Sequence, residues 1–505
     1  MLRAAAKIAA IPAAAAAAAI AYTYLTYDYR WWWNKRASSG KEVKDAENWE
    51  QTLIHGDCKP GWEKVREEFV HNFRARGELG GAICIYYRGE KVVDLWGGYR
   101  NRQQHEWEKD TLTNVFSTTK GISALAIAML SSRGKFHYDD KVSTHWPAFA
   151  QNGKEHVTIR QLLDHSCGLA GCSPPITLEQ LLNKETVRNF FAKQPMEWET
   201  PGDYKGYMAI TLGYYESALV QMTEGPKQRT IGQYLREEAF IPLGLENELF
   251  IGLPDSIPDS RISTIDGLEG LEALWNQGGF PDGFMWKLIM QPNSYTGRAF
   301  RNPKLSNAPG VMDYNRRDVK RPEMPAANGH ATARAIAKLY ACAERAINTK
   351  FQDNPLGFNE QTMQVMMEPA KPGRKNGWND EVLGLDIAMG AGCLLAPTRE
   401  QLGSGQFCSI LSGFGTPGAG GSFGFCDPEA EVAFTYVMNR TGSIIVDDPR
   451  EFALRTKMYD CVQQCRENDG RNLPRLPLEK LRVAQNLSSK YMDKYPVLKP
   501  LSTKL

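Results

Sequence analysis

The sequence lacks the cysteine and histidine patterns that mark metal and redox sites. Its 10 cysteines contain no CxxC pair, and its 8 histidines form no HExxH motif. These absences argue against a structural zinc site and against a zinc-dependent protease. A chain of 505 residues buries a core large enough to fold without disulfide bonds, so we expect reduced cysteines.

An excess of charge of one sign is also lacking. The chain carries 60 Lys and Arg against 58 Asp and Glu, a net charge of +2. Such a balance gives no field to hold a polyanion, so we expect no nucleic-acid partner. With 42% hydrophobic and 23% charged residues, the composition is that of a globular protein and excludes fibrous and globally disordered chains.

The chain begins with a long apolar segment. Residues 8–27 contain no charged side chain and approach the roughly 20 residues that a helix needs to span hydrocarbon. Trp31 to Trp33 follow, and aromatic rings of this kind prefer a membrane interface. We therefore predict an N-terminal membrane-anchor helix within residues 1–33, with membrane contact through residues 8–33.

Two other interpretations of this N-terminal segment stay open. Arg3 and Lys7, with no acidic residue before Asp28, are typical of a cleaved mitochondrial presequence, whereas the apolar run also suits a secretory signal. The predicted location is mitochondrial and membrane-anchored, at the inner membrane or in the intermembrane space, with a secretory-pathway membrane as the alternative. The polar residues 34–60 are predicted to form a linker.

Strand-forming sequence lies on both sides of a long helical region. Two β-rich runs flank a Gly89 turn within residues 80–100, and short β-type runs return after residue 390. Apolar residues at helical spacing predict helices over residues 62–76 and 117–132, and a further helix is predicted over residues 449–465.

This order predicts one α+β domain over residues 61–465. Its sheet is completed by the two ends, residues 61–135 and 390–465, and a mainly helical part over residues 136–389 is inserted between them. Residues 466–505 are predicted to be a basic tail.

Ser117 and Lys120 open the second of these helices. Three residues apart, the two side chains share one helix face, and the free N–H groups of a helix start favour a developing oxyanion. Serine needs a base to remove its proton, and a lysine serves as that base only if its pKa falls from about 10.4 towards 7. Its surroundings must then destabilise the ammonium, relative to the neutral amine, by roughly 4–5 kcal/mol. The same spacing occurs at Ser38–Lys41 and Ser132–Lys135, and a helix N-cap explains Ser117 equally well.

Three further segments resemble one enzyme superfamily. They are TIRQLLDHSCGLAG starting at Thr158, WETPGDYKGYMAITLG starting at Trp198 and FGTPGAGGSFGF starting at Phe414. With the element Asn328–Arg334, they resemble segments of the serine β-lactamases and penicillin-binding proteins, in the same order, over roughly residues 60–465. Within that superfamily the chain is most similar to class C-like esterases and to the serine β-lactamase-like proteins of mitochondria.

The resemblance implies a fold and a set of roles. The fold is the β-lactamase/transpeptidase type, an antiparallel sheet flanked by helices, and the chemistry needs no metal and no organic cofactor. Ser117 is implied to be the acylated nucleophile, Lys120 its base partner and Tyr207 a second base, with a phenolate favoured by a cationic lysine nearby. The N–H groups of Ser117 and Ala419 are implied to bind the oxyanion, and Gly418 to let the substrate approach.

One departure from the superfamily bears on the substrate. Members carry a Lys or His where this chain has Thr416, followed by Pro417, so no charge is available there for a β-lactam carboxylate. Met208 and Ala209 also replace the serine and asparagine of lactamases. We therefore expect a small ester, amide or peptide substrate, contacted in part by Thr416, or no catalysis at all.

The two functions left open belong to different classes. The first is a membrane-attached serine hydrolase, and the second is an inactive structural subunit of a mitochondrial membrane complex. His165 is expected to be a buried structural histidine. The aromatic and methionine side chains that form either an acyl pocket or ordinary core are Trp275, Phe280, Phe284, Met285 and Trp286.

Overall fold

The computed structural model describes most of the predicted domain. The described residues are 53–267, 283–305, 311–395, 410–442, 444, 447–470 and 473–478. The predicted anchor over residues 1–33 and most of the predicted tail lie outside them. In these described ranges, no helix combines the length and the apolarity needed to cross a membrane.

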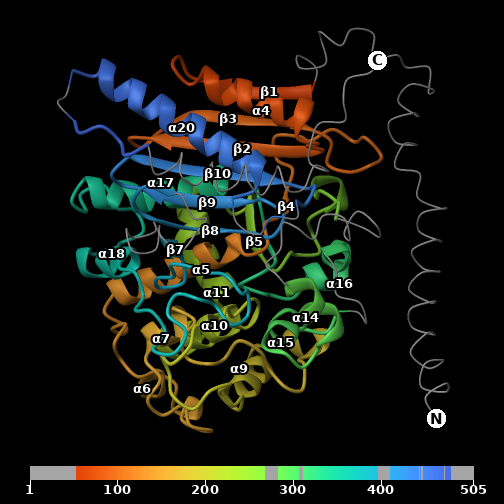
Figure 1. The fold of residues 1–505 in the computed structure, drawn as a ribbon, viewed down its shortest axis with the longest axis vertical. Helices are drawn as coiled ribbons and strands as arrows, with labels where there is room; N and C mark the ends of the chain where they lie inside the picture. The colour runs from red at the N-terminus through yellow and green to blue at the C-terminus, as the bar shows by residue number, and fades with distance from the viewer. Residues whose placement is uncertain are drawn as a thin grey trace.

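A seven-stranded antiparallel sheet forms the centre of the fold (Figure 1). Its strands, in spatial order, are β1 (Ile54–Cys58), β3 (Glu90–Gly98), β2 (Gly80–Tyr87), β10 (Val432–Met438), β9 (Phe423–Asp427), β8 (Phe414–Pro417) and β7 (Leu394–Leu395). In the middle of the sheet β2 pairs with β10, so that Ile83 lies opposite Tyr436. The two ends of the domain therefore complete one sheet, as the sequence predicts.

The β2–β3 hairpin confirms the predicted turn at Gly89. Arg88 and Gly89 both have positive φ, 53° and 77°, which is the conformation of a tight two-residue hairpin turn. The strand β1 was not predicted, because residues 54–58 fall within the predicted linker. Ile54 is the one apolar residue of that strand buried in the core, so the segment carries no strand-like alternation.

Helices cover both faces of the sheet. On one face α4 (Glu63–Ala75) packs against α20 (Pro449–Asn468). On the other face α17 (Ala333–Asn348) lies across β2, β9 and β10, and α5 (Thr118–Ser132) contacts β8 and β9. Nearly every residue of α5 is buried, which explains its all-round apolar sequence.

The helical part fills the lower half of the molecule in Figure 1. Its helices are α6 (Val142–His145), α7 (Ile159–Leu163), α8 (Leu178–Leu181), α9 (Lys184–Ala192), α10 (Thr211–Thr223), α11 (Ile231–Leu235), α12 (Ile241–Leu243), α14 (Phe284–Met290), α15 (Tyr295–Phe300), α16 (Arg317–Lys320) and α18 (Glu360–Met367). Short 3₁₀ turns cover Pro147–Phe149, Asp259–Arg261 and Val311–Asn315, and a π-helical turn covers Arg236–Phe240.

A second, three-stranded sheet joins the helical part to the start of α5. It consists of β4 (Thr113–Asn114), β6 (Gly329–Ala331) and β5 (Leu249–Ile251), with β6 in the middle. Two of these strands, and the sheet-covering helix α17, lie within the predicted helical part. The fold is therefore α+β as predicted, but its middle section returns twice to β structure.

Candidate active site

A strained turn sets the position of Ser117. Phe116 adopts a left-handed conformation with φ 46°, which is unfavourable for an aromatic residue. Its N–H donates to Asn114 Oδ1 at 3.0 Å, and its carbonyl accepts the Thr119 hydroxyl at 2.5 Å. The Phe116 ring also meets the Tyr314 ring edge-on, with centroids 5.2 Å apart. These contacts hold the sharp bend that leads from β4 into α5.

Ser117 occupies the N-cap position of α5 without acting as a cap. Its side chain makes no hydrogen bond to the first turn of the helix. Instead, Ser117 Oγ accepts a hydrogen bond from the Tyr207 hydroxyl at 2.8 Å and lies 3.2 Å from Lys120 Nζ. The structure thus brings together the three side chains that the resemblance singles out, from α5 and from the segment that precedes α10.

The surroundings of the Lys120 amine favour its neutral form. The side chain is 1% exposed, and Nζ donates to the carbonyl oxygens of Ala209 at 2.6 Å and Ala326 at 3.0 Å. A neutral amine has two N–H groups and one lone pair, so two bonds to carbonyls leave the lone pair for Ser117 Oγ. Burial lowers the pKa of Lys120 to about 7, against an opposing effect of Glu216.

Tyr207 remains a protonated phenol at neutral pH. Burial raises the pKa of Tyr207 well above its usual value, the hydrogen bond with Ser117 opposes this, and Asp380 adds to it. The resemblance instead predicts a phenolate favoured by a cationic lysine nearby. The structure differs because burial raises the pKa of Tyr207 and also lowers the pKa of Lys120 to about 7, so the nearby ammonium is only partly formed at neutral pH.

His165 packs beside Tyr207 and bonds the backbone next to it. Its Nδ1 accepts the Met208 N–H at 3.0 Å, and its ring centroid lies 5.1 Å from that of Tyr207. Burial, with Lys120 and Lys205 nearby, lowers the pKa of His165 far below its usual value, so the ring is neutral. It is a buried histidine, as expected from the sequence, and it fixes the backbone next to Tyr207.

The loop after β8 is fastened to the start of α5. Ser422 Oγ donates to the Val115 carbonyl at 2.9 Å and lies 3.1 Å from the Thr118 hydroxyl. A Cβ added at Gly418 would collide with the Val115 carbonyl and with Ser422. Only glycine therefore allows this loop to lie so close to the helix that carries Ser117.

Where the loop after β8 meets the start of α5, each of the two segments has one backbone N–H without a protein acceptor. In the part of the chain that the structure describes, neither the Ser117 N–H nor the Ala419 N–H donates to a protein acceptor. Ala419 is exposed, whereas its neighbour Gly418 is buried against α5. Both groups are therefore available as donors, and their role in binding a substrate oxygen stays a prediction.

Thr416 lies away from the surface of the site. Its side chain is only 4% exposed, and a Cβ added at Gly121 of α5 would stand 3.1 Å from its Oγ1. The Thr416 side chain packs against α5, and its predicted contact with the substrate stays a prediction. Pro417, as the last residue of β8, supplies no N–H to the sheet.

The aromatic and methionine residues predicted for an acyl pocket lie in different environments. Phe284 is buried beside Phe300, with ring centroids 5.4 Å apart, whereas Trp286 is 60% exposed. Met285 is half-buried on the same helix. Trp275 and Phe280 lie outside the described residues.

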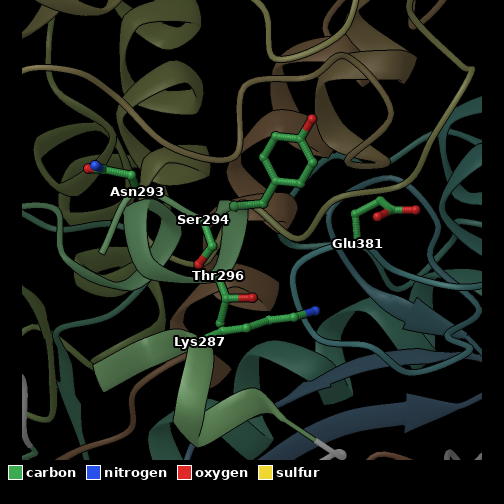
Figure 2. Close-up of a pocket in the computed structure, with 6 residues that line it drawn as sticks. Lys287, Asn293, Ser294, Thr296 and Glu381 are labelled. Atoms are coloured by element: carbon green, nitrogen blue, oxygen red, sulfur yellow. The ribbon is translucent and has the colours of Figure 1, made fainter. Parts of the chain in front are cut away.

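A separate polar cavity lies beside α14 and α15. It measures about 320 Å³, and Figure 2 shows the side chains around it, which are those of Lys287, Asn293, Ser294, Tyr295, Thr296 and Glu381. Thr296 Oγ1 donates to the Val382 carbonyl at 2.7 Å, which fixes α15 to the loop around residue 382. Ser117, Lys120 and Tyr207 do not line this cavity.

Sequence reasoning missed the groups that act on Lys120. Ala209 and Ala326 contribute only backbone carbonyls, which no side-chain pattern reveals. Ala326 does lie two residues before the element Asn328–Arg334 that the resemblance marked, and this was the available signal. Glu216 lies in an apolar helix, where a buried carboxyl cannot be told from a surface one.

The sheet, the helical part and the Ser–Lys–Tyr cluster together define a serine hydrolase fold of the β-lactamase/transpeptidase type. The chain belongs to the β-lactamase family, because the sequence profile of that family matches residues 66–455. The resemblance to serine β-lactamases and penicillin-binding proteins is thereby confirmed.

Named relatives agree with this assignment. The chain is 29% identical over 422 residues to the esterase/β-lactamase LipL of Mycobacterium tuberculosis, covering 81% of this chain and 88% of LipL. A family VIII carboxylesterase of known structure is 29% identical with a TM-score of 0.66, covering 81% of this chain and 99% of that one. A penicillin-binding protein homologue from Caulobacter crescentus is 31% identical with a TM-score of 0.65 and the same coverage. The predicted similarity to the serine β-lactamase-like proteins of mitochondria stays a prediction.

Proposed function

We propose that this protein is a serine hydrolase that cleaves small neutral esters through an acyl-enzyme on Ser117. The observation that carries the proposal is the convergence of Lys120 Nζ and the Tyr207 hydroxyl on Ser117 Oγ, at 3.2 and 2.8 Å. The similarity to an esterase and to a carboxylesterase over four fifths of the chain supports it.

Acylation begins with the neutral amine of Lys120. Its lone pair takes the Ser117 hydroxyl proton while Ser117 Oγ forms a bond to the ester carbonyl carbon. The carbonyl oxygen becomes an oxyanion, and the free N–H groups of Ser117 and Ala419 stabilise that charge. Lys120 then carries one positive charge, and the intermediate carries one negative charge.

Collapse of the intermediate releases an alcohol. The bond between the carbonyl carbon and the leaving oxygen breaks, and that oxygen takes the Tyr207 phenolic proton. Tyr207 is then a phenolate and Lys120 an ammonium, so that in the next stage the phenolate takes a proton from water and Lys120 returns its proton to Ser117 Oγ. Because burial keeps the Tyr207 phenol protonated, it is suited to donate this proton rather than to remove one from Ser117. Water then attacks the acyl-enzyme by the reverse sequence and restores Ser117.

The charge of the site limits the substrate. Thr416 is neutral and buried, and both N–H groups of the neutral Lys120 amine are held by carbonyls. No cation from these residues is therefore available to a substrate carboxylate. We propose a neutral ester, with amides and peptides as slower substrates and with acidic β-lactams hydrolysed poorly.

A fluorophosphonate probe tests the mechanism directly. Wild type is expected to be labelled and to hydrolyse p-nitrophenyl acetate and butyrate, and Ser117→Ala is expected to do neither. Ser132→Ala is the matched control, because Ser132 has the same spacing to Lys135 at the other end of α5. Equal labelling of wild type and Ser117→Ala contradicts the mechanism. An unlabelled wild type that purifies in a stoichiometric complex supports the alternative of a structural subunit in a membrane assembly.

We further propose that residues 8–33 attach the enzyme to a membrane, with a mitochondrial membrane as the first candidate. The apolar run and the tryptophans that follow it support this proposal. The full chain is expected to stay with membranes in alkaline carbonate and to enter isolated mitochondria, and a variant lacking residues 1–33 is expected to do neither. Uptake into microsomes instead favours a secretory membrane.

A further inference from the structure

Asp164 and Lys205 form a buried ion pair for which neither the sequence nor the proposed mechanism gives a role. Lys205 Nζ lies 3.2 Å from Asp164 Oδ2 and 3.3 Å from the Asp164 carbonyl oxygen. The Lys205 and Asp164 side chains are only 5% and 8% exposed. Stability alone does not explain such a pair, because apolar residues of similar volume often replace a buried ion pair without loss.

His165, next to this ion pair, holds the backbone on both sides of Tyr207. The His165 carbonyl accepts the Gly206 N–H, and His165 Nδ1 accepts the Met208 N–H, each at 3.0 Å. His165 itself has a left-handed backbone with φ 62°, which is unfavourable for a residue with a side chain of this size. The position of Tyr207 therefore depends on contacts that keep His165 in this conformation.

The Asp164 carboxyl supplies such contacts. Its Oδ1 accepts the Ser166 N–H at 3.1 Å and the Ser166 hydroxyl at 2.5 Å, so the carboxyl spans the turn at His165. Its Oδ2 faces Lys205, which precedes Tyr207 by two positions. The ion pair thus joins the turn that holds Tyr207 to the segment that carries Tyr207.

The segment around Lys205 is also fixed on a second side. The Lys205 carbonyl accepts the Glu381 N–H at 2.9 Å, and Lys205 pairs with Asp380 in an isolated parallel β-bridge. The Gly202 N–H donates to the Ser166 carbonyl at 2.8 Å. Lys205 is therefore held by its backbone to the loop around residue 380 and by its side chain to the turn around His165.

We propose that Asp164 and Lys205 are positioning residues, which hold the Tyr207 hydroxyl at hydrogen-bond distance from Ser117 Oγ; this rests on the proposed hydrolase function. Charge-assisted hydrogen bonds are directional, whereas apolar packing fills space without fixing the distance between two segments. Accuracy matters at this place, because a displacement of about 1 Å at reacting groups costs about 10²-fold in rate. The pair acts through the backbone that it holds and not through contact with the substrate.

The test uses Asp164→Asn/Lys205→Met, which removes both charges and nearly keeps both shapes. The amide oxygen of the new side chain at position 164 still accepts the two hydrogen bonds from Ser166, so this variant isolates the ion pair. The matched control is Glu224→Gln/Arg229→Met. It removes another ion pair of similar burial, with side chains 5% and 9% exposed, beyond the end of α10 that lies away from Tyr207.

One readout is the ¹³C NMR signal of the Tyr207 ring carbon Cζ, assigned by its loss in Tyr207→Phe. Ser117→Ala removes the acceptor of the Tyr207 hydroxyl, so it shows where the signal lies once this hydrogen bond is lost. In Asp164→Asn/Lys205→Met we expect the signal to move towards that position, and in the control we expect it to stay. A signal that keeps its wild-type position overturns the proposal. If the double variant does not fold, Asp164→Asn alone is judged by the same criterion.

The second readout is a double-mutant cycle with Tyr207→Phe. Ethyl butyrate is the substrate, because its alkoxide leaving group needs a proton. Loss of the ion pair is expected to lower kcat by about 10–100-fold and to leave KM within about threefold. In the Tyr207→Phe background the same change is expected to lower kcat by less than about twofold, since no hydroxyl is left to misplace. An equal fall in both backgrounds indicates a general structural effect and overturns the proposal.

The hydrolase proposal and the positioning proposal fail in different ways. If wild type hydrolyses no ester and is not labelled by the fluorophosphonate, the hydrolase proposal fails. The NMR signal still decides in that case whether the ion pair holds the Tyr207 hydroxyl at Ser117. If hydrolysis depends on Ser117 and the Tyr207 signal ignores the ion pair, only the assignment of Asp164 and Lys205 fails.

Discussion

The Tyr207 hydroxyl donates to Ser117 Oγ over 2.8 Å, although 90 positions separate the two residues in the chain. Ser117 belongs to a helix that lies against the sheet, and Tyr207 belongs to the helical part. His165 secures the backbone beside Tyr207 through the Met208 N–H. The hydrogen bond therefore exists only when the two parts of the domain are packed together, and it reports on the geometry of the whole site.

Removing the Tyr207 hydroxyl distinguishes its effect on catalysis from its effect on stability. Tyr207→Phe keeps the ring but removes the proton that the leaving alcohol takes, so we expect kcat to fall by about 10²–10⁴-fold. The melting temperature is expected to change little. Steady-state hydrolysis of p-nitrophenyl butyrate and a thermal melt measure the two effects. A kcat within a factor of three of wild type contradicts the role of the phenol.

The pH dependence of hydrolysis follows from Lys120. Its pKa is lowered to about 7, and only the unprotonated amine accepts the Ser117 proton. We therefore expect kcat/KM to rise about tenfold per pH unit below 7 and to level off above it. Lys120→Met removes the base, and its residual activity is expected to lack this limb. A rate that is flat between pH 5.5 and 8.5 in wild type argues against a lysine base.

The closeness of Gly418 to α5 predicts a strong effect from one methyl group. Gly418→Ala places a Cβ against the Val115 carbonyl and Ser422, so the loop moves and carries the Ala419 N–H with it. Loss of one oxyanion donor is expected to lower kcat by about 10²–10³-fold. Gly134→Ala is the control, since nothing lies within 4 Å of its added Cβ and only its φ of 68° opposes the change. That control is expected to lose about 1 kcal/mol of stability and no activity.

The burial of Thr416 predicts that this position does not control substrate binding. Thr416→Val keeps the shape of the side chain and removes a buried hydroxyl that has no hydrogen-bond partner in the described part of the protein, so ester hydrolysis is expected to stay within about threefold of wild type. Thr416→Lys forces an ammonium into the packing against α5 and is expected to lower the melting temperature without creating nitrocefin hydrolysis. Efficient nitrocefin turnover in Thr416→Lys would show that the side chain at this position does reach the substrate.

The parts of the fold that sequence predicts are those with local patterns. The hairpin around Gly89, the apolar helix α5 and the helix α20 each carry their own periodicity or turn signal, and each is found within a few residues of its predicted bounds. Strand β1 has no such pattern because a single apolar residue anchors it. Strands β5 and β6 are three residues long, and their pairing depends on partners far away in the chain.

The candidate active site likewise contains residues that the sequence predicts and groups that only the folded structure reveals. Ser117, Lys120, Tyr207 and Ala419 were identified from motifs, because the superfamily carries these residues in recognisable segments. The carbonyls of Ala209 and Ala326 hold the Lys120 amine through their position in the fold alone. The protonation states of Lys120 and Tyr207 depend on burial, which only the folded structure reveals.

The pairing of β2 with β10 ties residues near the start of the domain to residues some 350 positions later. On the ribosome, the first strands of the sheet are made long before their central partner leaves the exit tunnel. The loop that contributes the Ala419 N–H is synthesised just before that partner. A nascent chain that ends before this loop therefore lacks the Ala419 N–H that we propose as an oxyanion donor, and the proposed ester hydrolysis is expected only once translation is almost complete.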